Sequence, residues 1–253
     1  MIVIDIETQP IPELVEKFIK PLPAFDQNEV KFGNTKDPEK RAALVASKQA
    51  EHDDATVAHM AKAKDRAALN PLTAQVLVIG LYNDHAQSPE HRMEFLEGNE
   101  KLILSNFWSQ WYDTHLSTDR FVFWSGSSNS ENFDPDMLIR RSWILGVKVP
   151  PQVINGRYLG SRWEDAAQRY MFGRFNEYCG LSRAAEELGL FGDGAKIFPK
   201  SKDDTVTGAN FWQWYENKMT CDAAKACPSQ KTLAMSYLTN DLLILDAIAG
   251  RIY

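Results

Sequence analysis

The sequence contains few cysteines, and they are not spaced as metal ligands. Its 253 residues include only three, Cys179, Cys221 and Cys227. An odd and sparse set of thiols excludes a disulfide-stabilised scaffold and a structural zinc site. Such a set is typical of a protein that works in a reducing compartment.

Long hydrophobic runs are also missing. The longest apolar stretches, such as residues 75–81, fall well short of the roughly 18 residues that span a bilayer. The chain opens directly on the apolar segment MIVIDIET, without the basic region of a signal peptide. We therefore expect a cytoplasmic protein, neither secreted nor embedded in a membrane, and no membrane partner.

The chain is moderately acidic overall, but its charged residues are unevenly distributed. The net charge is −6, with 28 basic and 34 acidic residues. Residues 140–175, in contrast, carry seven arginines or lysines and only two acids, interleaved with aromatic side chains. This composition suits a single-stranded nucleic acid, because cations bind phosphates and aromatic rings stack on bases. An ordinary solvated face is the alternative explanation.

Strand and helix signals alternate along the chain. Short apolar runs predict strands at 2–6, 75–82, 93–96 and 121–124. Helical patterns and capping residues predict helices at 100–115, 134–145, 163–172, 182–189, 208–218 and 230–249. The chain has no internal repeat and no linker-like segment, so we expect a single α/β domain, residues 1–253, with one central sheet.

The first two strands are separated by a long insertion, which should carry structure of its own. Asp37 and Pro38 provide an N-cap and a first helical residue, and a charged, Ala-rich stretch follows them. Residues 28–69 are therefore predicted to be a largely helical insertion. Because it has few large apolar residues, it should cover an edge or project rather than form core.

Carboxylates occur at three places where a strand or helix would hold them rigidly. Asp5 and Glu7 are two residues apart on the first strand, so both project from one face. Two such carboxylates repel each other unless a cation that prefers oxygen ligands, such as Mg²⁺, lies between them. Asp134 opens a helix, and Tyr237 and Asp241 lie one turn apart on the last helix. Taken singly, each place has an ordinary explanation, such as a helix cap or a core tyrosine.

Taken together, the DxET strand, the mid-chain Asp134 and the C-terminal YxxxD resemble the three motifs of the DnaQ-like, or DEDD, 3′–5′ exonuclease superfamily. The order and approximate spacing match over essentially the whole chain. Segments 70–82 and 208–215 are similar to predicted exonucleases related to the proofreading domain of family-B DNA polymerases. The resemblance implies a ribonuclease-H-like five-stranded mixed sheet flanked by helices, with the helical insertion after the first strand.

The resemblance also implies a role for each motif residue. Asp5, Glu7, Asp134 and Asp241 would hold two divalent cations, Mg²⁺ or Mn²⁺, and Tyr237 would orient the attacking water. The second half of the chain contains no histidine, so the match is to the tyrosine class of the superfamily and not to the histidine class. The implied reaction is two-metal-ion hydrolysis that releases nucleoside 5′-monophosphates from the 3′ end of DNA, preferably single-stranded.

Substrate contacts follow from the resemblance less directly. Thr8, beside the first motif, would hold the 3′-terminal nucleotide. The turn before Phe133 is longer than the family pattern, so Ser127, Asn129 and Asn132 are all candidates for the asparagine expected there. We take Asn129 and Phe133 as substrate-binding residues.

Basic residues downstream of the second motif would contact the nucleic acid. Arg157 and Arg162 are expected to follow the incoming strand, and a loop with Lys196, Lys200 and Lys202 to reach phosphates. A further acid, Asp165, is interpreted as a helix cap or as support for the site. Replication or repair proteins of a bacterial or phage-infected cell would be partners.

Other functions fit the sequence less well. An exoribonuclease stays open, because no residue identifies a contact to a 2′-hydroxyl, but the resemblance favours DNA. A nucleic-acid-binding module that lost catalysis is disfavoured, because all four acids and the tyrosine are present. A DxDxT phosphatase is excluded, because Glu7 and Gln9 occupy the positions of its second Asp and its Thr.

Overall fold

The chain divides into two compact units. The computed structural model describes residues 1–83, 85–86, 92–114, 119–125, 133–172, 179–191, 206–218 and 229–253. One unit, Met1–Gln9 with Gln75–Tyr253, contains the main sheet and is called the sheet unit. The other, Pro10–Ala74, is called the arm.

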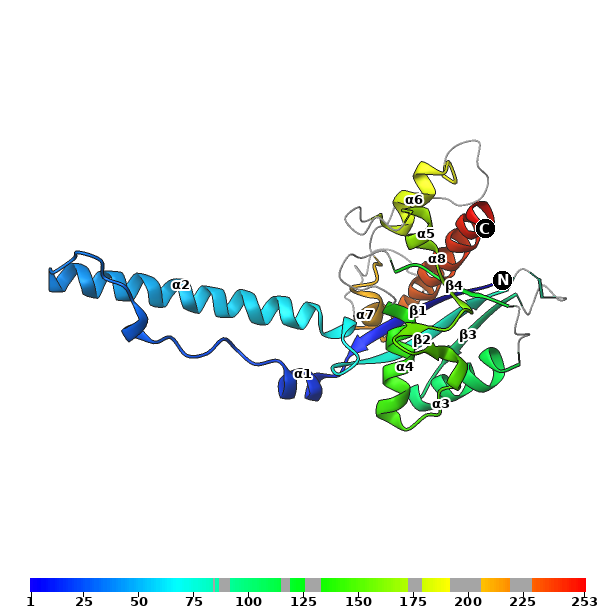
Figure 1. Ribbon diagram of the computed structural model, residues 1–253, viewed down its shortest axis with the longest axis horizontal. Coiled ribbons are helices and arrows are strands. Elements are labelled where there is room, and N and C mark those ends of the chain that lie inside the picture. Colours follow the sequence, from blue (N-terminus) through cyan, green and yellow to red (C-terminus); the bar gives the residue numbers. More distant parts are fainter. Residues whose placement is uncertain are drawn as a thin grey trace. The chain divides into compact units, whose positions relative to one another are not determined.

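Five strands form a mixed sheet in the order β3-β2-β1-β4-β7 (Figure 1). They are β1 (Ile2–Pro10), β2 (Ala74–Tyr82), β3 (Met93–Glu97), β4 (Phe121–Phe123) and β7 (Trp163–Asp165). β4 runs parallel to both β1 and β7, with Phe121 opposite Ile2 on one side and Trp163 on the other. β2 and β3 are antiparallel. The predicted α/β class with one central sheet is confirmed.

The remaining elements of the sheet unit are mostly helical. They are α3 (Glu100–Asn106), η4 (Phe107–Tyr112), α4 (Phe133–Leu145), η5 (Pro151–Val153), β5 (Ile154–Asn155), β6 (Tyr158–Leu159), α5 (Ala166–Tyr170), α6 (Leu181–Glu187), α7 (Phe211–Tyr215) and α8 (Gln230–Ile252). Four predicted helices occur with modest changes in their bounds, although α7 is shorter than the predicted 208–218. The helix predicted at 100–115 continues after Asn106 as a π-helix. The β5–β6 hairpin was not predicted.

The helix predicted at 163–172 is wrong in its first three residues, which form strand β7. Trp163 is buried among aromatic side chains opposite Phe121. The Asp165 carboxylate accepts hydrogen bonds from the backbone N–H groups of Ala167 and Gln168, so α5 begins only after it. Three residues are too few to reveal strand alternation, and the capping aspartate lies within the predicted helix.

One face of the sheet is covered by η4 and α4. Tyr112 stacks on Phe121 with ring centroids 5.4 Å apart and on Trp163 at 6.0 Å. The Trp108 indole donates a 2.8 Å hydrogen bond to Ser142 of α4. This aromatic cluster packs against β4 and β7 where the two strands begin side by side.

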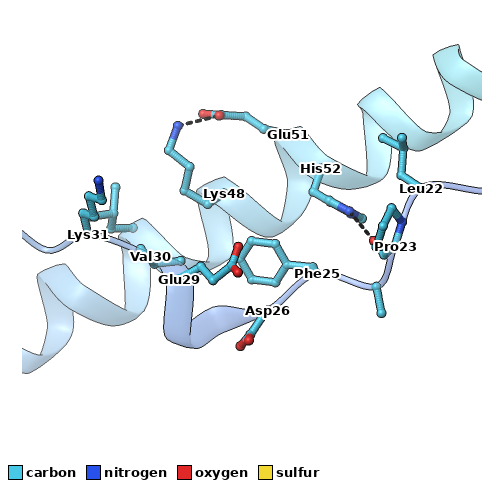
Figure 2. A pocket seen from close by; sticks show the side chains of 12 residues that line it. Leu22, Pro23, Phe25, Asp26, Glu29, Val30, Lys31, Lys48, Glu51 and His52 are labelled. Carbon is cyan, nitrogen blue, oxygen red and sulfur yellow. Dashed lines mark hydrogen bonds and ion pairs between the residues drawn. The ribbon is translucent and has the colours of Figure 1, made fainter.

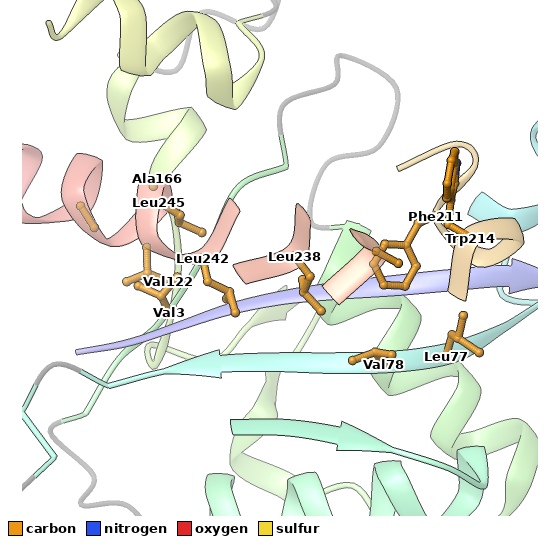
Figure 3. Close-up of a cluster of buried hydrophobic side chains, with 12 residues drawn as sticks. Val3, Leu77, Val78, Val122, Ala166, Phe211, Trp214, Leu238, Leu242 and Leu245 are labelled. Carbon is orange, nitrogen blue, oxygen red and sulfur yellow. The ribbon is translucent and has the colours of Figure 1, made fainter. Parts of the chain in front are cut away.

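The other face is covered by α7 and α8 (Figure 3). Leu238, Leu242 and Leu245 of α8 lie against buried valines of β1, β2 and β4. β1 and β2 run in opposite directions beneath them. Among the described residues, α8 is the one helix long and apolar enough to cross a membrane by length and composition, which is weak evidence because core helices pass the same test.

The arm consists mainly of one long helix and an extended segment. Its elements are α1 (Pro12–Phe18), η1 (Gln27–Glu29), α2 (Pro38–Asp65) and η2 (Ala67–Leu69), so the insertion is largely helical as predicted. The His52 ring on α2 hydrogen-bonds the Pro23 carbonyl at 2.9 Å, and a cavity of about 690 Å³ lies between the extended segment and the helix (Figure 2). None of the described side chains between Glu16 and Arg66 is buried, so this stretch has almost no core of its own.

A cluster of buried carboxylates as the candidate active site

Alternation along β1 directs Asp5 and Glu7 toward the face that α8 covers. Val3, two residues before Asp5, lies in the hydrophobic cluster with Leu242 of α8. Glu7 is only 6% exposed, and Asp5 is partly buried. The strand therefore directs both acids to the face that α8 covers, in line with the prediction that the two side chains share one face of the strand.

Asp134 lies at the start of α4, the helix that follows β4. Its side chain is 5% exposed. Burial raises the pKa of Asp134 well above its ordinary value, and the negative charges of Asp5 and Asp165 raise it further. This agrees with the sheet topology, because β1, β4 and β7 are parallel and their carboxyl ends meet at one edge.

Tyr237 and Asp241 approach this edge from α8. The Tyr237 hydroxyl donates a hydrogen bond to the Asp241 carboxylate one turn later. Burial raises the pKa of Asp241 to about 6, although this hydrogen bond opposes the rise. Burial also raises the pKa of the Tyr237 phenol, and the charges of Asp241 and Glu7 raise it further, so the hydroxyl stays protonated at neutral pH and can donate a hydrogen bond.

The acids influence one another strongly. Burial and the charge of Asp241 raise the pKa of Asp5 to about 8, against a hydrogen bond from the Ile6 backbone. The pKa of Glu7 lies well above its usual range because of burial first and then the charges of Asp5, Asp241 and Asp134. Since the charge of one acid raises the pKa of the next, Asp5, Glu7, Asp134 and Asp241 lie in one neighbourhood of the fold.

The donor set has the chemistry of a site for hard divalent cations. Four carboxylates offer only oxygen atoms, which Mg²⁺ and Mn²⁺ prefer. As the side chains stand, no three or more His, Cys, Asp or Glu among the described residues form a group that could hold a metal ion. The residues therefore fit such ions in type and number, and their carboxylates would have to converge to bind one.

Asp165 adds a fifth acid near the cluster but has hydrogen-bonding partners of its own. Its carboxylate accepts hydrogen bonds from the N–H groups of Ala167 at 2.9 Å and Gln168 at 3.3 Å, and from the Ser125 hydroxyl. The predicted helix-cap role is confirmed. In addition, its charge raises the pKa of Asp134.

Two of the predicted substrate-binding residues adjoin the acids along the chain. Thr8 follows Glu7 on β1 but is buried, and strand alternation directs its side chain to the opposite face of the sheet, while Phe133 is half-buried immediately before Asp134. The other residues predicted in the turn before Phe133 and in the lysine loop lie outside the described residues, namely Ser127, Asn129, Asn132, Lys196, Lys200 and Lys202.

The two predicted arginines contact groups of the protein itself. Arg157 is exposed beside the β5–β6 hairpin and donates a 2.6 Å hydrogen bond to the Tyr158 hydroxyl. Arg162 immediately precedes β7, at the opposite end of the parallel strands from Glu7. Its guanidinium donates to the backbone carbonyls of Asp119 and Tyr112 at 3.1 and 2.7 Å. Its contacts are therefore structural.

One neighbour of the site was not predicted. A Cβ atom at Gly208 would lie 3.9 Å from the Tyr237 hydroxyl, so the backbone before α7 passes beside the tyrosine. Gly208 lies in segment 208–215, which carries part of the family resemblance, but the sequence gave no indication of its contact with Tyr237.

Comparisons with known proteins do not identify a relative. No protein-family model matches the chain, and neither a curated protein nor a solved structure matches it significantly. The candidate site therefore depends on its own side chains and on the motif resemblance.

Proposed function

We propose that this chain is a metal-dependent 3′–5′ exonuclease of the DEDD type, acting on DNA and preferably on single strands. The observation that carries the proposal is the shared location of Asp5, Glu7, Asp134 and Asp241, with Tyr237 hydrogen-bonded to the last of them. Several carboxylates are seldom buried close to one another unless they serve a function.

The architecture supports the same proposal. A five-stranded mixed sheet with helices on both faces agrees with the ribonuclease-H-like fold that the motifs imply. Asp5 and Glu7 lie on β1 beyond its pairing with β4, and Asp134 lies at the start of the helix that follows β4, so these acids lie near the edge where the parallel strand β4 ends. At such an edge α/β sheets usually bind their ligands.

Asp5, Glu7, Asp134 and Asp241 are the residues that would hold the divalent cations. When bound, such ions make water a stronger nucleophile and neutralise charge on the phosphate. The four carboxylates contribute the negative charge that attracts the ions, and burial keeps competing water away.

Tyr237 would orient the attacking water. Its hydroxyl stays protonated because its pKa is raised, so it would orient the water by hydrogen bonding and would not abstract a proton. Since its O–H is directed to Asp241, the hydroxyl oxygen would accept the hydrogen bond from the water. Phe133, next to Asp134, and the backbone at Thr8, next to Glu7, would contact the terminal nucleotide.

The proposal is tested by product analysis. Single-stranded DNA and an RNA of equal sequence are each incubated with the chain and Mn²⁺, and the products are separated by chromatography. We expect nucleoside 5′-monophosphates from DNA. Monophosphates from RNA alone would make the chain an exoribonuclease, and intact strands that still bind the protein would make it a nucleic-acid-binding module.

A further inference from the structure

Gly80 is an unexpected residue in the middle of a buried strand. β2 reads AQVLVIGLY, and Gly80 lies opposite Phe95 of β3 in the regular ladder. Glycine in the interior of a strand is unfavourable, because it loses more backbone freedom on folding and contributes no side chain to packing. Its presence often indicates that another segment approaches the strand closely.

Helix α8 makes that approach. A Cβ atom at position 80 would lie 2.7 Å from Leu242 Cδ1 and 3.2 Å from Leu238 Cγ. Real Cβ contacts are essentially never shorter than 3.0 Å. The nearest atom is the mobile end of the Leu242 side chain, but Leu238 is approached at Cγ, close to its own backbone, and both leucines are completely buried. A side chain at Gly80 would therefore press on α8 through both leucines.

The same two leucines adjoin the polar residues that α8 contributes to the site. Leu242 immediately follows Asp241, and Leu238 immediately follows Tyr237. The depth at which these leucines lie over β2 therefore sets how far Tyr237 and Asp241 reach toward the acids of the neighbouring strand β1.

We propose that Gly80 is a positioning residue for the carboxylate site: its missing side chain lets α8 approach the sheet closely enough for Asp241 and Tyr237 to act with Asp5 and Glu7. This inference deepens the proposed exonuclease function and rests on it. Gly80 itself touches neither substrate nor metal in this account.

The closing experiment compares four variants with the wild type. Gly80→Ala adds the clashing methyl group, and Leu242→Val removes the atom that it would meet. The double variant Gly80→Ala/Leu242→Val tests rescue. Gly250→Ala, on the same helix with nothing within 4 Å of its Cβ, is the matched control.

Three quantities are measured for each variant: the Mn²⁺ dissociation constant by calorimetry, kcat and KM on single-stranded DNA, and the Asp241–Asp5 separation in a crystal structure. For Gly80→Ala we expect a wider separation, weaker Mn²⁺ binding and a kcat lowered by roughly 10–100-fold, with KM little changed. The double variant should recover to within about threefold of Leu242→Val, and Gly250→Ala should match the wild type.

The outcomes separate this inference from the proposed function. A Gly80→Ala chain that is less stable but keeps the wild-type separation, Mn²⁺ affinity and kcat would overturn it, since Gly80 would then serve packing alone. Failure of the double variant to recover would overturn it as well. A wild type that neither binds Mn²⁺ nor cuts DNA would instead refute the exonuclease proposal, and the measured separation alone would then decide whether Gly80 sets the position of α8. Should Gly80→Ala not fold, the same three quantities are compared between the double variant Gly80→Ala/Leu242→Val and Leu242→Val, and this comparison decides the inference.

Discussion

The buried carboxylates of Asp5 on β1 and Asp241 on α8 bind protons more tightly in the folded chain than in the unfolded one. Burial, with neighbouring charge, raises the pKa of Asp5 from 3.8 to about 8, and burial raises that of Asp241 from 3.8 to about 6. A raised acid pKa favours the folded state at low pH, and this contribution is lost as the pH rises through the folded value. The site therefore opposes folding at neutral pH unless a cation replaces the protons.

The first prediction follows from the upward direction of these pKa shifts. Without divalent ions, the free energy of unfolding should fall between about pH 4 and pH 8, by at most about 1.4 kcal/mol per pH unit for each group. Urea titrations across this range would measure it. Asp5→Asn should flatten the slope and raise stability at pH 8. A slope equal in wild type and variant would contradict the raised pKa of Asp5.

Addition of a divalent metal ion should oppose this loss of stability with rising pH. Mn²⁺ competes with protons for the same carboxylates, so its stabilising effect should grow from pH 6 to pH 8. Thermal unfolding with Mn²⁺ and with a chelator measures the difference at each pH. An Mn²⁺ effect that does not change with pH would mean that the ion binds elsewhere.

Tyr237 gives a prediction that separates water orientation from metal binding. Tyr237→Phe removes the hydroxyl but no carboxylate, so kcat should fall by roughly 100-fold while the Mn²⁺ affinity stays within about threefold. Tyr215→Phe is the matched control, because the Tyr215 hydroxyl donates to Glu97, which is not one of the four carboxylates of the site. Equal losses in the two variants would argue against the proposed role.

Among the helices, α4 is fixed to the sheet unit by a buried ion pair. The Arg141 guanidinium donates to Glu100 of α3 at 2.8 and 2.6 Å, and the two side chains are only 4% and 9% exposed. Glu100 also accepts a 2.8 Å hydrogen bond from the Val76 backbone of β2. This pair holds together α3, α4 and β2, and α4 carries Asp134 in its first turn.

Removing one partner of that pair should be costly. Arg141→Met leaves Glu100 buried and unpaired, so unfolding free energy should fall by about 3–5 kcal/mol. Arg140→Met, which breaks only the exposed pair with Asp136, should cost less than about 0.5 kcal/mol. Urea unfolding of both variants provides the comparison. Similar losses would show that burial of the Arg141 pair contributes nothing.

How much of this arrangement the sequence predicts depends on how local each signal is. Strand β1 and the spacing of Asp5 and Glu7 are local, and so is the one-turn spacing of Tyr237 and Asp241, so the sequence predicts which faces carry them. The ion pair of Arg141 with Glu100 joins distant segments and has no sequence signature. The same holds for β7, whose three residues become a strand only because β4 lies beside them.

For the whole molecule, the division into two units carries its own prediction. The ends of the arm meet, because the Ile11 N–H donates a 2.7 Å hydrogen bond to the Thr73 carbonyl. Replacing residues 12–72 by an Asn-Gly turn should therefore leave the sheet unit folded, with Tm within about 5 °C of the full chain. Thermal unfolding and Mn²⁺ binding would measure this, and a shortened chain that fails to fold would show that the arm supports the sheet.

The central claim is that the carboxylate cluster removes nucleotides from a 3′ end, and one time course tests it most directly. A 5′-labelled single-stranded DNA is incubated with Mn²⁺ and one of three proteins: the wild type, Asp5→Asn or Asp136→Asn. Asp136→Asn is the control, because it replaces an exposed aspartate of α4. The account predicts a ladder that shortens step by step with the wild type and Asp136→Asn, and intact DNA with Asp5→Asn. DNA left intact by the wild type, or a ladder unchanged by Asp5→Asn, would contradict it.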